Sequence, residues 1–410
     1  MPPRNSNAGG NNRTPRRLLP AVPQLPPKSG GKGKRARRAK ARKPRASGKR
    51  TVPGLSKAGI NFLKCAFAAP DFSVDPGQGI PDNYEGKALM RKDVFTNTLN
   101  FTVNLDTFIL VMPTPGVAYW SCTVPVGSFP QQNTVWTPTY NASFTTLFGA
   151  PTNQAADAPI DPVERGTNVA KFRYASNVCE ITPTSNFTQF AGSITVWKVP
   201  ITMLDSVQTT GTGAAQASTV QKSLVGVEGL ARVSPDNKPF KFLDGAFSMA
   251  VNTQPDWDFT PVHSGVTRIP SIGQSATTNT TWGQFQGDFI GLGSLQSLVF
   301  RVSTPTGAVN ASIIKVWSCI EYQPSPASAF YEFAGTTPAF DPMALKLYRD
   351  IALKIPVAVT VAENDGFWSD KVMPALKASL NALRIVGGVV PQVGAAMTGV
   401  DALAGLFGML

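Results

Sequence analysis

Residues 99–126 read LNFTVNLDTFILVMPTPGVAYWSCTVPV, and apolar and polar residues alternate on both sides of the turn sequence MPTPG. Further strand patterns follow at 171–181, 192–203, 223–233, 238–251, 294–303 and 311–322. We therefore expect roughly eight or more strands over about 240 residues, with no helical pattern between them. This order excludes a parallel βαβ sheet and favours an antiparallel sandwich. The segments 127–168 and 203–300 also carry long connections, which predict surface loops.

The first fifty residues are strongly basic. They hold 16 of the 38 Lys and Arg and none of the 25 Asp and Glu. The other 360 residues therefore have a net charge of −3, against +13 for the whole chain. Because such a segment cannot bury apolar area, we expect residues 1–55 to be a disordered arm that neutralises RNA. On charge alone, a nuclear-localisation tail is the alternative. The cations expected to contact phosphates are Arg35, Arg37, Arg38, Lys40, Arg42, Lys43 and Arg45.

The composition excludes several classes of function. His263 is the single histidine, which argues against Ser–His or Cys–His nucleophilic catalysis and against His-rich metal sites. The four cysteines are far apart and form no CxxC motif, a pattern typical of reduced thiols in a cytosolic product. Only 15% of the residues are charged, so large buried interfaces between subunits are expected.

Both flanks of the strand region show helical patterns. Residues 56–70 are apolar and predict a short helix, and Asp341-Pro342 predicts an N-cap followed by proline at the first helical position. The segment 367–386 is amphipathic, which is typical of a helix packed under a domain or lying in a membrane surface. Its apolar positions are Trp368, Val372, Leu376, Leu380 and Leu383.

Several long strings of the chain closely resemble the coat protein precursors of the alphanodaviruses, the insect nodaviruses. They are NFLKCAFAAPDFSVDPGQGIPD (61–82), DTFILVMPTPGVAYW (106–120), KFRYAS (171–176), PTSNFTQFAGSITVWK (183–198), STPTGAVNASIIKVWSCIEY (303–322) and PVAVTVAEN (356–364). The resemblance runs from about residue 56 to 410 and is weaker in the loops at 127–168 and 203–295. In the basic tail, composition alone matches.

The resemblance implies an all-β fold, an eight-stranded antiparallel viral jelly roll with long outward loops and a small helical inner domain formed by the two chain ends. It implies a shell of 180 copies with T=3 symmetry around positive-strand, single-stranded RNA. The protein would be made in the host cytoplasm, reside in the virion and use a host receptor that the sequence does not identify. The chain would divide into an arm at 1–55, an inner link at 56–92, a shell domain at 93–335, a cleavage-site segment at 336–364 and a membrane-active peptide at 365–410.

The resemblance also implies a single-turnover, autocatalytic cleavage after assembly. The scissile bond falls between Asn364 and Asp365, and the catalytic acid falls on Asp71 in AAPDF. The residue after the Asn is usually small in the family, so Asp365 is expected to slow cleavage or to tie it to pH. An Asn side chain or a water can attack the Asn carbonyl, and either route needs proton transfer. A carboxyl group buried by assembly has a raised pKa and can donate the proton.

Two further family traits concern metal and membrane. Calcium at subunit contacts is an implied cofactor, and acids two apart on a strand face the same side, which suits oxygen coordination. The acids available are Glu228, Asp256 and Asp258, with Asp161 or Glu164 in place of a family ligand that aligns with Thr167. The released peptide 365–410 is expected to disrupt host membranes.

Two alternative hypotheses are open. In the first, the coat protein assembles without cleaving, because Asp365 has replaced a small residue. In the second, the chain is a cellular jelly-roll binding protein with a basic localisation tail, which predicts a soluble monomer with an aromatic-lined sugar site.

Overall fold

The computed structural model describes residues 55–67, 79–114, 116–131, 134–141, 169–184, 191–210, 217–231, 237–252, 257–261, 275–279, 295–326, 328–364 and 374. The chain divides into two units, Met1–Arg50 and Thr51–Leu410. The described residues all belong to the second unit, so the basic arm lies outside them.

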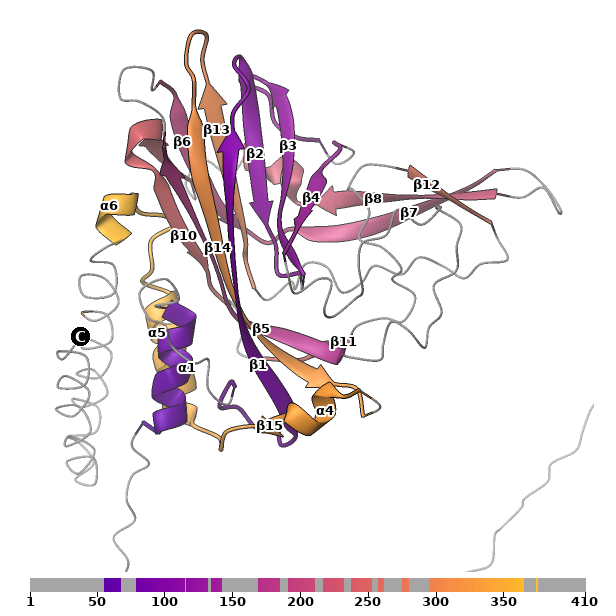
Figure 1. Ribbon diagram of the computed structural model, residues 1–410, viewed down its shortest axis with the longest axis vertical. Helices are drawn as coiled ribbons and strands as arrows, with labels where there is room; N and C mark the ends of the chain where they lie inside the picture. The colour runs from indigo at the N-terminus through magenta and orange to yellow at the C-terminus, as the bar shows by residue number, and fades with distance from the viewer. Residues whose placement is uncertain are drawn as a thin grey trace, which may run out of the picture. The chain divides into compact units, whose positions relative to one another are not determined.

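Antiparallel sheets make up most of the described chain (Figure 1). The first sheet has the order β10-β5-β14-β1-β15, with β11 also paired to β5. Its strands are β1 (Lys87–Asn100), β5 (Val169–Pro183), β10 (Ala246–Ala250), β11 (Thr260–Pro261), β14 (Ala311–Pro324) and β15 (Gly335–Thr336). The long pairings of β14 with β1 and with β5 form its centre.

The second sheet has the order β4-β3-β2-β13-β6-β9, and a third, smaller sheet has the order β12-β8-β7. The strands of the second are β2 (Leu105–Val111), β3 (Val117–Pro125), β4 (Thr137–Tyr140), β6 (Ser193–Val199), β9 (Asn237–Lys241) and β13 (Ser297–Thr304). Those of the third are β7 (Thr202–Thr210), β8 (Ala217–Val225) and β12 (Ser275–Asn279). The prediction of an antiparallel all-β fold is thus confirmed, while the eight-strand jelly-roll count stays a prediction.

The main apolar core joins the first two sheets. Phe172 of β5 and Ile314 of β14 belong to the same buried cluster as Phe108 of β2 and Trp197 of β6. Residues 94–100 of β1 alternate between exposed and half-buried positions, as period-two patterning predicts for a strand with one buried face. Alternation therefore supplies the apolar faces that pack together.

Several strand predictions are wrong in detail. Residues 99–111 hold the end of β1 and all of β2, because Asn104 takes a left-handed conformation with φ of 60° and turns the chain. Residues 223–231 hold the end of β8 and then the 3₁₀ helix η2 (Val227–Ala231), with Gly226 at a φ of 97° between them. Residues 238–251 hold two strands of different sheets, β9 and β10, which are separated by a 3₁₀ helix and by Gly245 at a φ of 63°. In each place the strand pattern continues through a turn.

Helices from both flanks cover one face of the first sheet (Figure 1). Helix α1 (Lys57–Phe67) and helix α5 (Pro342–Ala352) share an apolar cluster with Val178 and Trp317 of that sheet. The ring of Phe67 stacks on Tyr348 with centroids 4.8 Å apart. The helix expected at 56–70 is therefore confirmed over its described residues.

The cap of α5 is also confirmed, and it links the two helices. Asp341 accepts a hydrogen bond from the N–H of Ala344 at 3.1 Å, as an N-cap does, and a second from the N–H of Ser56 at 2.7 Å. The remaining helices are α4 (Phe330–Phe333), α6 (Val361–Asn364) and the 3₁₀ helix η3 (Phe242–Asp244). None of the described helices is both long and apolar enough to cross a membrane.

Candidate functional site

The segment before Asn364 is paired to the outer edge of the first sheet. Phe247 of β10 and Val359 exchange two backbone hydrogen bonds, of 2.8 and 2.9 Å. The Ser248 hydroxyl donates to the carbonyl of Val357 at 2.6 Å, and Lys198 Nζ donates to the carbonyl of Pro356 at 2.8 Å. These contacts hold the backbone of residues 356–359, the segment that leads to Asn364.

Lys198 is a buried ammonium group in this arrangement. Loss of solvation lowers its pKa from 10.5 to about 7. The carbonyl oxygen of Pro356 is the hydrogen-bond acceptor for its Nζ. Near neutral pH the charge of Lys198 is therefore sensitive to small changes in pH.

A capping box starts the single turn of α6. The N–H of Thr360 donates to Glu363 Oε2 at 3.0 Å, and the N–H of Glu363 donates back to Thr360 Oγ1 at 3.2 Å. The N–H of Asn364 then donates to the carbonyl of Thr360 at 3.1 Å. Because one helical turn is unstable alone, this box and the contacts with β5 and β10 hold it. The turn places the backbone of Asn364 in a fixed conformation at its end.

The side chain of Asn364 points into the protein and is bonded to Glu180. Asn364 is 5% exposed, and its Nδ2 donates to Glu180 Oε2 at 3.0 Å. Glu180 is 7% exposed, and its other oxygen accepts from Thr182 Oγ1 at 3.0 Å. Lys315 Nζ lies 3.9 Å from that oxygen, on a side chain that is partly exposed. A buried carboxyl group thus faces the side-chain amide of the expected scissile residue.

Sheet register explains why these two residues meet. Lys315 of β14 lies opposite Glu180 of β5, Glu180 lies opposite Phe247 of β10, and Phe247 pairs with Val359. One row across the first sheet therefore carries the acid and the chain that leads to Asn364. Sequence reasoning missed Glu180, and its only signal was one acid among the apolar residues of VCEI at 178–181.

An open groove of about 850 Å³ is lined by the segment before Asn364. Its lining includes Pro356 to Thr360, Glu363, and the cations Lys238 and Lys241 of β9. Solvent reaches the segment from this groove, whereas the Asn364 side chain is buried against the sheet.

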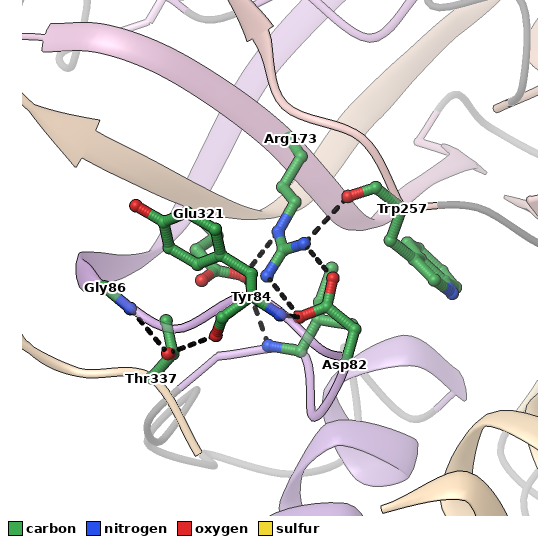
Figure 2. A network of polar contacts seen from close by, with 8 residues as sticks. Asp82, Tyr84, Gly86, Arg173, Trp257, Glu321 and Thr337 are labelled. Atoms are coloured by element: carbon green, nitrogen blue, oxygen red, sulfur yellow. Dashed lines mark hydrogen bonds and ion pairs between the residues drawn. The ribbon is translucent and has the colours of Figure 1, made fainter. Parts of the chain in front are cut away.

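A second polar cluster holds the chain at Ile80–Asp82 (Figure 2). Arg173 of β5 donates from Nε to Glu321 Oε2 at 2.8 Å, and its Nη1 bonds the carboxylate of Asp82 and the carbonyl of Trp257. The N–H of Ile80 donates to the same Glu321 oxygen at 3.2 Å. Burial raises the pKa of Glu321, and the adjacent Arg173 offsets part of that rise.

The cluster lies next to the segment that holds the expected acid. Asp71 falls between the end of α1 at Phe67 and the fixed residues from Ile80 on, in the range 68–78 that lies outside the described residues. Phe67 is buried in the helix cluster, and Ile80 is fully buried. Both ends of this segment are therefore anchored to the first sheet and its helices.

Most of the other predicted site residues lie outside the described residues. Of the predicted calcium ligands, Asp258 is exposed and Glu228 lies in η2. Within the part of the chain that the structure describes, no three His, Cys, Asp or Glu side chains cluster as a metal site. The residues outside the described ranges are Asp71, Asp365, Asp161, Asp256, Trp368, Val372, Leu376, Leu380, Leu383 and the seven arm cations from Arg35 to Arg45.

Comparisons with known proteins add an independent observation. The model of the peptidase A6 family matches residues 55–408. The capsid protein alpha of Flock house virus is 42% identical over 360 residues, which cover 86% of this chain and 84% of the relative. That of Black beetle virus is 41% identical over 372 residues, with 89% and 88% covered. Among solved structures, a protein of T=1 particles derived from infectious bursal virus is 10% identical to this chain, and the match covers 75% of this chain and 95% of that protein. The TM-score is 0.44, so the likeness carries no argument about function.

Proposed function

The chain belongs to the peptidase A6 family, together with the nodavirus capsid proteins alpha, and from this we propose that it is a viral coat precursor that cleaves itself once, after Asn364. The observation that carries this proposal is the buried amide of Asn364, bonded to Glu180 at the end of a segment paired to β10. Buried amides are found in many cores, but here it belongs to the residue that the family resemblance marks as scissile. The alternative of a cellular sugar-binding protein does not agree with this family membership.

The cleavage is a single turnover of each copy. The bond between the Asn364 carbonyl carbon and the Asp365 nitrogen breaks, and the Asp365 nitrogen leaves as an amine that must gain a proton. We assign the proton donor to Asp71, the family's acid position. Helix α1 ends four residues before Asp71 and packs on β5, the strand that carries Glu180, which supports this assignment. Neighbouring subunits that bury the carboxyl group would raise its pKa and keep it protonated.

The test is the substitution Asn364→Ala in the full chain. Expressed alone, the parent should give particles that age to products 1–364 and 365–410, visible on gels and by intact mass. Asn364→Ala should assemble and give no 365–410 product, and Asn100→Ala, at an exposed position of β1, should mature like the parent. Release of the same peptide from Asn364→Ala at the parental rate would show that the scissile residue is misassigned.

The arm and the shell follow from the same family membership. We propose a T=3 shell of 180 copies around single-stranded RNA, located in the virion. Sixteen cations on each arm would bring about 2,900 positive charges, the order needed to offset much of a genome of several thousand phosphates. The nucleic acid content of purified particles, compared with that of a variant lacking residues 1–50, checks this assignment.

The C-terminal product is assigned to membrane disruption. Its amphipathic positions include Leu376 and Leu380, which step by one helical turn. A synthetic 365–410 peptide should release dye from liposomes, and charged residues at these two positions should suppress the release. Equal leakage from both peptides would contradict the amphipathic-helix account.

Calcium stays a proposal that rests on the resemblance. Its ligands would be carboxylates from Glu228, Asp256, Asp258 and Asp161, whose oxygen atoms suit that ion. The test is the metal content of particles that are dialysed against a chelator and then returned to calcium. Particles that stay unchanged and metal-free would contradict the calcium proposal.

A further inference from the structure

We propose that Glu180 is the base that accepts a proton from Asn364 Nδ2, so that this nitrogen attacks the Asn364 carbonyl carbon and forms a five-membered imide. The inference rests on the proposed cleavage after Asn364, for which attack by the Asn side chain is one of the two routes given above, and what it adds is the proton acceptor. The family resemblance assigns an acid at Asp71 and no base.

The orientation of the amide follows from the chemistry of its partner. An ionised carboxylate only accepts hydrogen bonds, so the atom of Asn364 that faces Glu180 Oε2 at 3.0 Å has to be the NH₂ group. The reverse orientation would bring two oxygen atoms together in a buried place. The nucleophilic nitrogen is therefore held by a carboxylate oxygen that can take its proton.

Glu180 has few partners among the described residues. They are one hydroxyl, from Thr182, the Asn364 amide, and Lys315 at 3.9 Å on a partly exposed side chain. Glu321 on the adjacent strand differs, because a direct bond from the Arg173 guanidinium and the N–H of Ile80 both stabilise its charge. The carboxylate oxygens of Glu180 are therefore not occupied by a guanidinium in the described part of the chain, and one of them is in contact with the Asn364 amide.

Proton transfer is what an amide nitrogen needs in order to react. Its lone pair is delocalised into the carbonyl, so it attacks poorly until a base removes a proton. In the proposed step a proton moves from Nδ2 to Glu180 Oε2, and a bond forms between Nδ2 and the Asn364 carbonyl carbon. The bond to the Asp365 nitrogen then breaks, and that nitrogen takes a proton from an acid, for which Asp71 is the candidate. No water is consumed until the imide opens.

The geometry is built by the backbone and not by a loop. Glu180 and the chain before Asn364 lie in the same row of the first sheet, through the pairs Glu180–Phe247 and Phe247–Val359. The capping box of α6 then sets the position of Asn364 relative to Val359. Strands and a capped turn position reacting groups more accurately than loops do.

The experiment compares full-length particles of the parent with Glu180→Gln, Glu180→Asp and a control, Glu332→Gln, at an exposed glutamate of α4. Glutamine keeps the size of the side chain and can still accept the Nδ2 hydrogen bond, but it cannot take the proton. We expect Glu180→Gln to assemble and to release 365–410 about a hundredfold or more slowly, Glu180→Asp to retain part of the rate, and the control to match the parent.

Two readouts separate a base from a structural partner. Glu180→Asp should restore part of the rate that Glu180→Gln loses, because aspartate can still take a proton and glutamine can only accept the hydrogen bond. Trypsin releases the C-terminal peptide 355–364 of the large product after Lys354. In the parent this peptide should be lighter by one water, as the imide, or should contain isoasparagine from its opening. Direct attack by water gives ordinary asparagine alone, and this measurement needs no variant.

The outcomes distinguish the two proposals. A parent that ages without any 365–410 product overturns the proposed cleavage itself. Cleavage by Glu180→Gln at the parental rate, or ordinary asparagine as the sole end of peptide 355–364, leaves the cleavage in place and overturns the role of Glu180.

Discussion

Replacing Arg173 by methionine should leave the buried carboxyl group of Glu321 without its cationic partner. Arg173 is 2% exposed and Glu321 is fully buried, so the substitution keeps the apolar stem and removes the cation that stabilises Glu321. The carboxyl group then avoids a buried, unpaired charge by taking up a proton. At pH 7 that costs about 4 kcal/mol for a group whose solution pKa is near 4.3, and at pH 5 about 1 kcal/mol. The loss of stability should therefore shrink as the pH falls.

The assay is the apparent melting temperature of particles at one scan rate. At roughly 2 °C per kcal/mol, Arg173→Met should melt about 8 °C below the parent at pH 7 and about 2 °C below it at pH 5. Adding Glu321→Gln should recover most of the loss at pH 7. The control is Arg91→Met, which breaks the partly exposed pair with Asp93 and should cost about 1 kcal/mol or less.

The result that would refute this reasoning is an equal loss at both pH values without recovery by Glu321→Gln. The loss would then come from packing, because the Arg173 guanidinium also lies 4.1 Å from the ring centroid of Phe259.

Two further predictions concern the segment before Asn364. Thr360→Ala removes half of the capping box, so the turn of α6 should lose about 1 kcal/mol of stability and amide exchange in peptide 355–364 should become about fivefold faster. Unchanged exchange would show that the box does not hold α6. Lys198 has a pKa of about 7 when folded against 10.5 when exposed, so above pH 7 the folded state binds fewer protons than the unfolded state and stability rises with pH. Relative to Lys198→Met, the parent should gain up to about 1.4 kcal/mol per pH unit between pH 7 and 9, measured as apparent melting temperature, and a constant difference would contradict the assignment.

Local signals explain what could be predicted from the sequence. Alternation gave the antiparallel strands, because each strand must bury one face, and Asp341-Pro342 gave a helix start, because a cap is a contact between near neighbours. The turn at Asn104 was missed, because alternating residues continue through it and only the backbone conformation breaks the strand. Signals of short range thus fix the type of element better than its ends.

The candidate site shows the same limit. Asn364 was identified through a long family string, but Glu180 lies 184 residues away and meets it only through the pairing of β5 with β10 and of β10 with the segment at Val359. No periodicity within β5 reports that pairing. A lone acid in an apolar strand indicates that some partner exists without showing which one.

The contact between Asn364 and Glu180 bears on why cleavage would wait for assembly. Both residues belong to one subunit and already touch there, so the nucleophile and its proton acceptor need no neighbour to meet. What the reaction still lacks is a protonated donor for the Asp365 nitrogen, since an amide nitrogen leaves only as an amine. Burial of a carboxyl group between subunits raises its pKa and creates that donor. On the proposed mechanism, assembly therefore acts on Asp71 rather than on Asn364, and particles of Glu180→Gln should cleave about a hundredfold or more slowly even when they assemble completely.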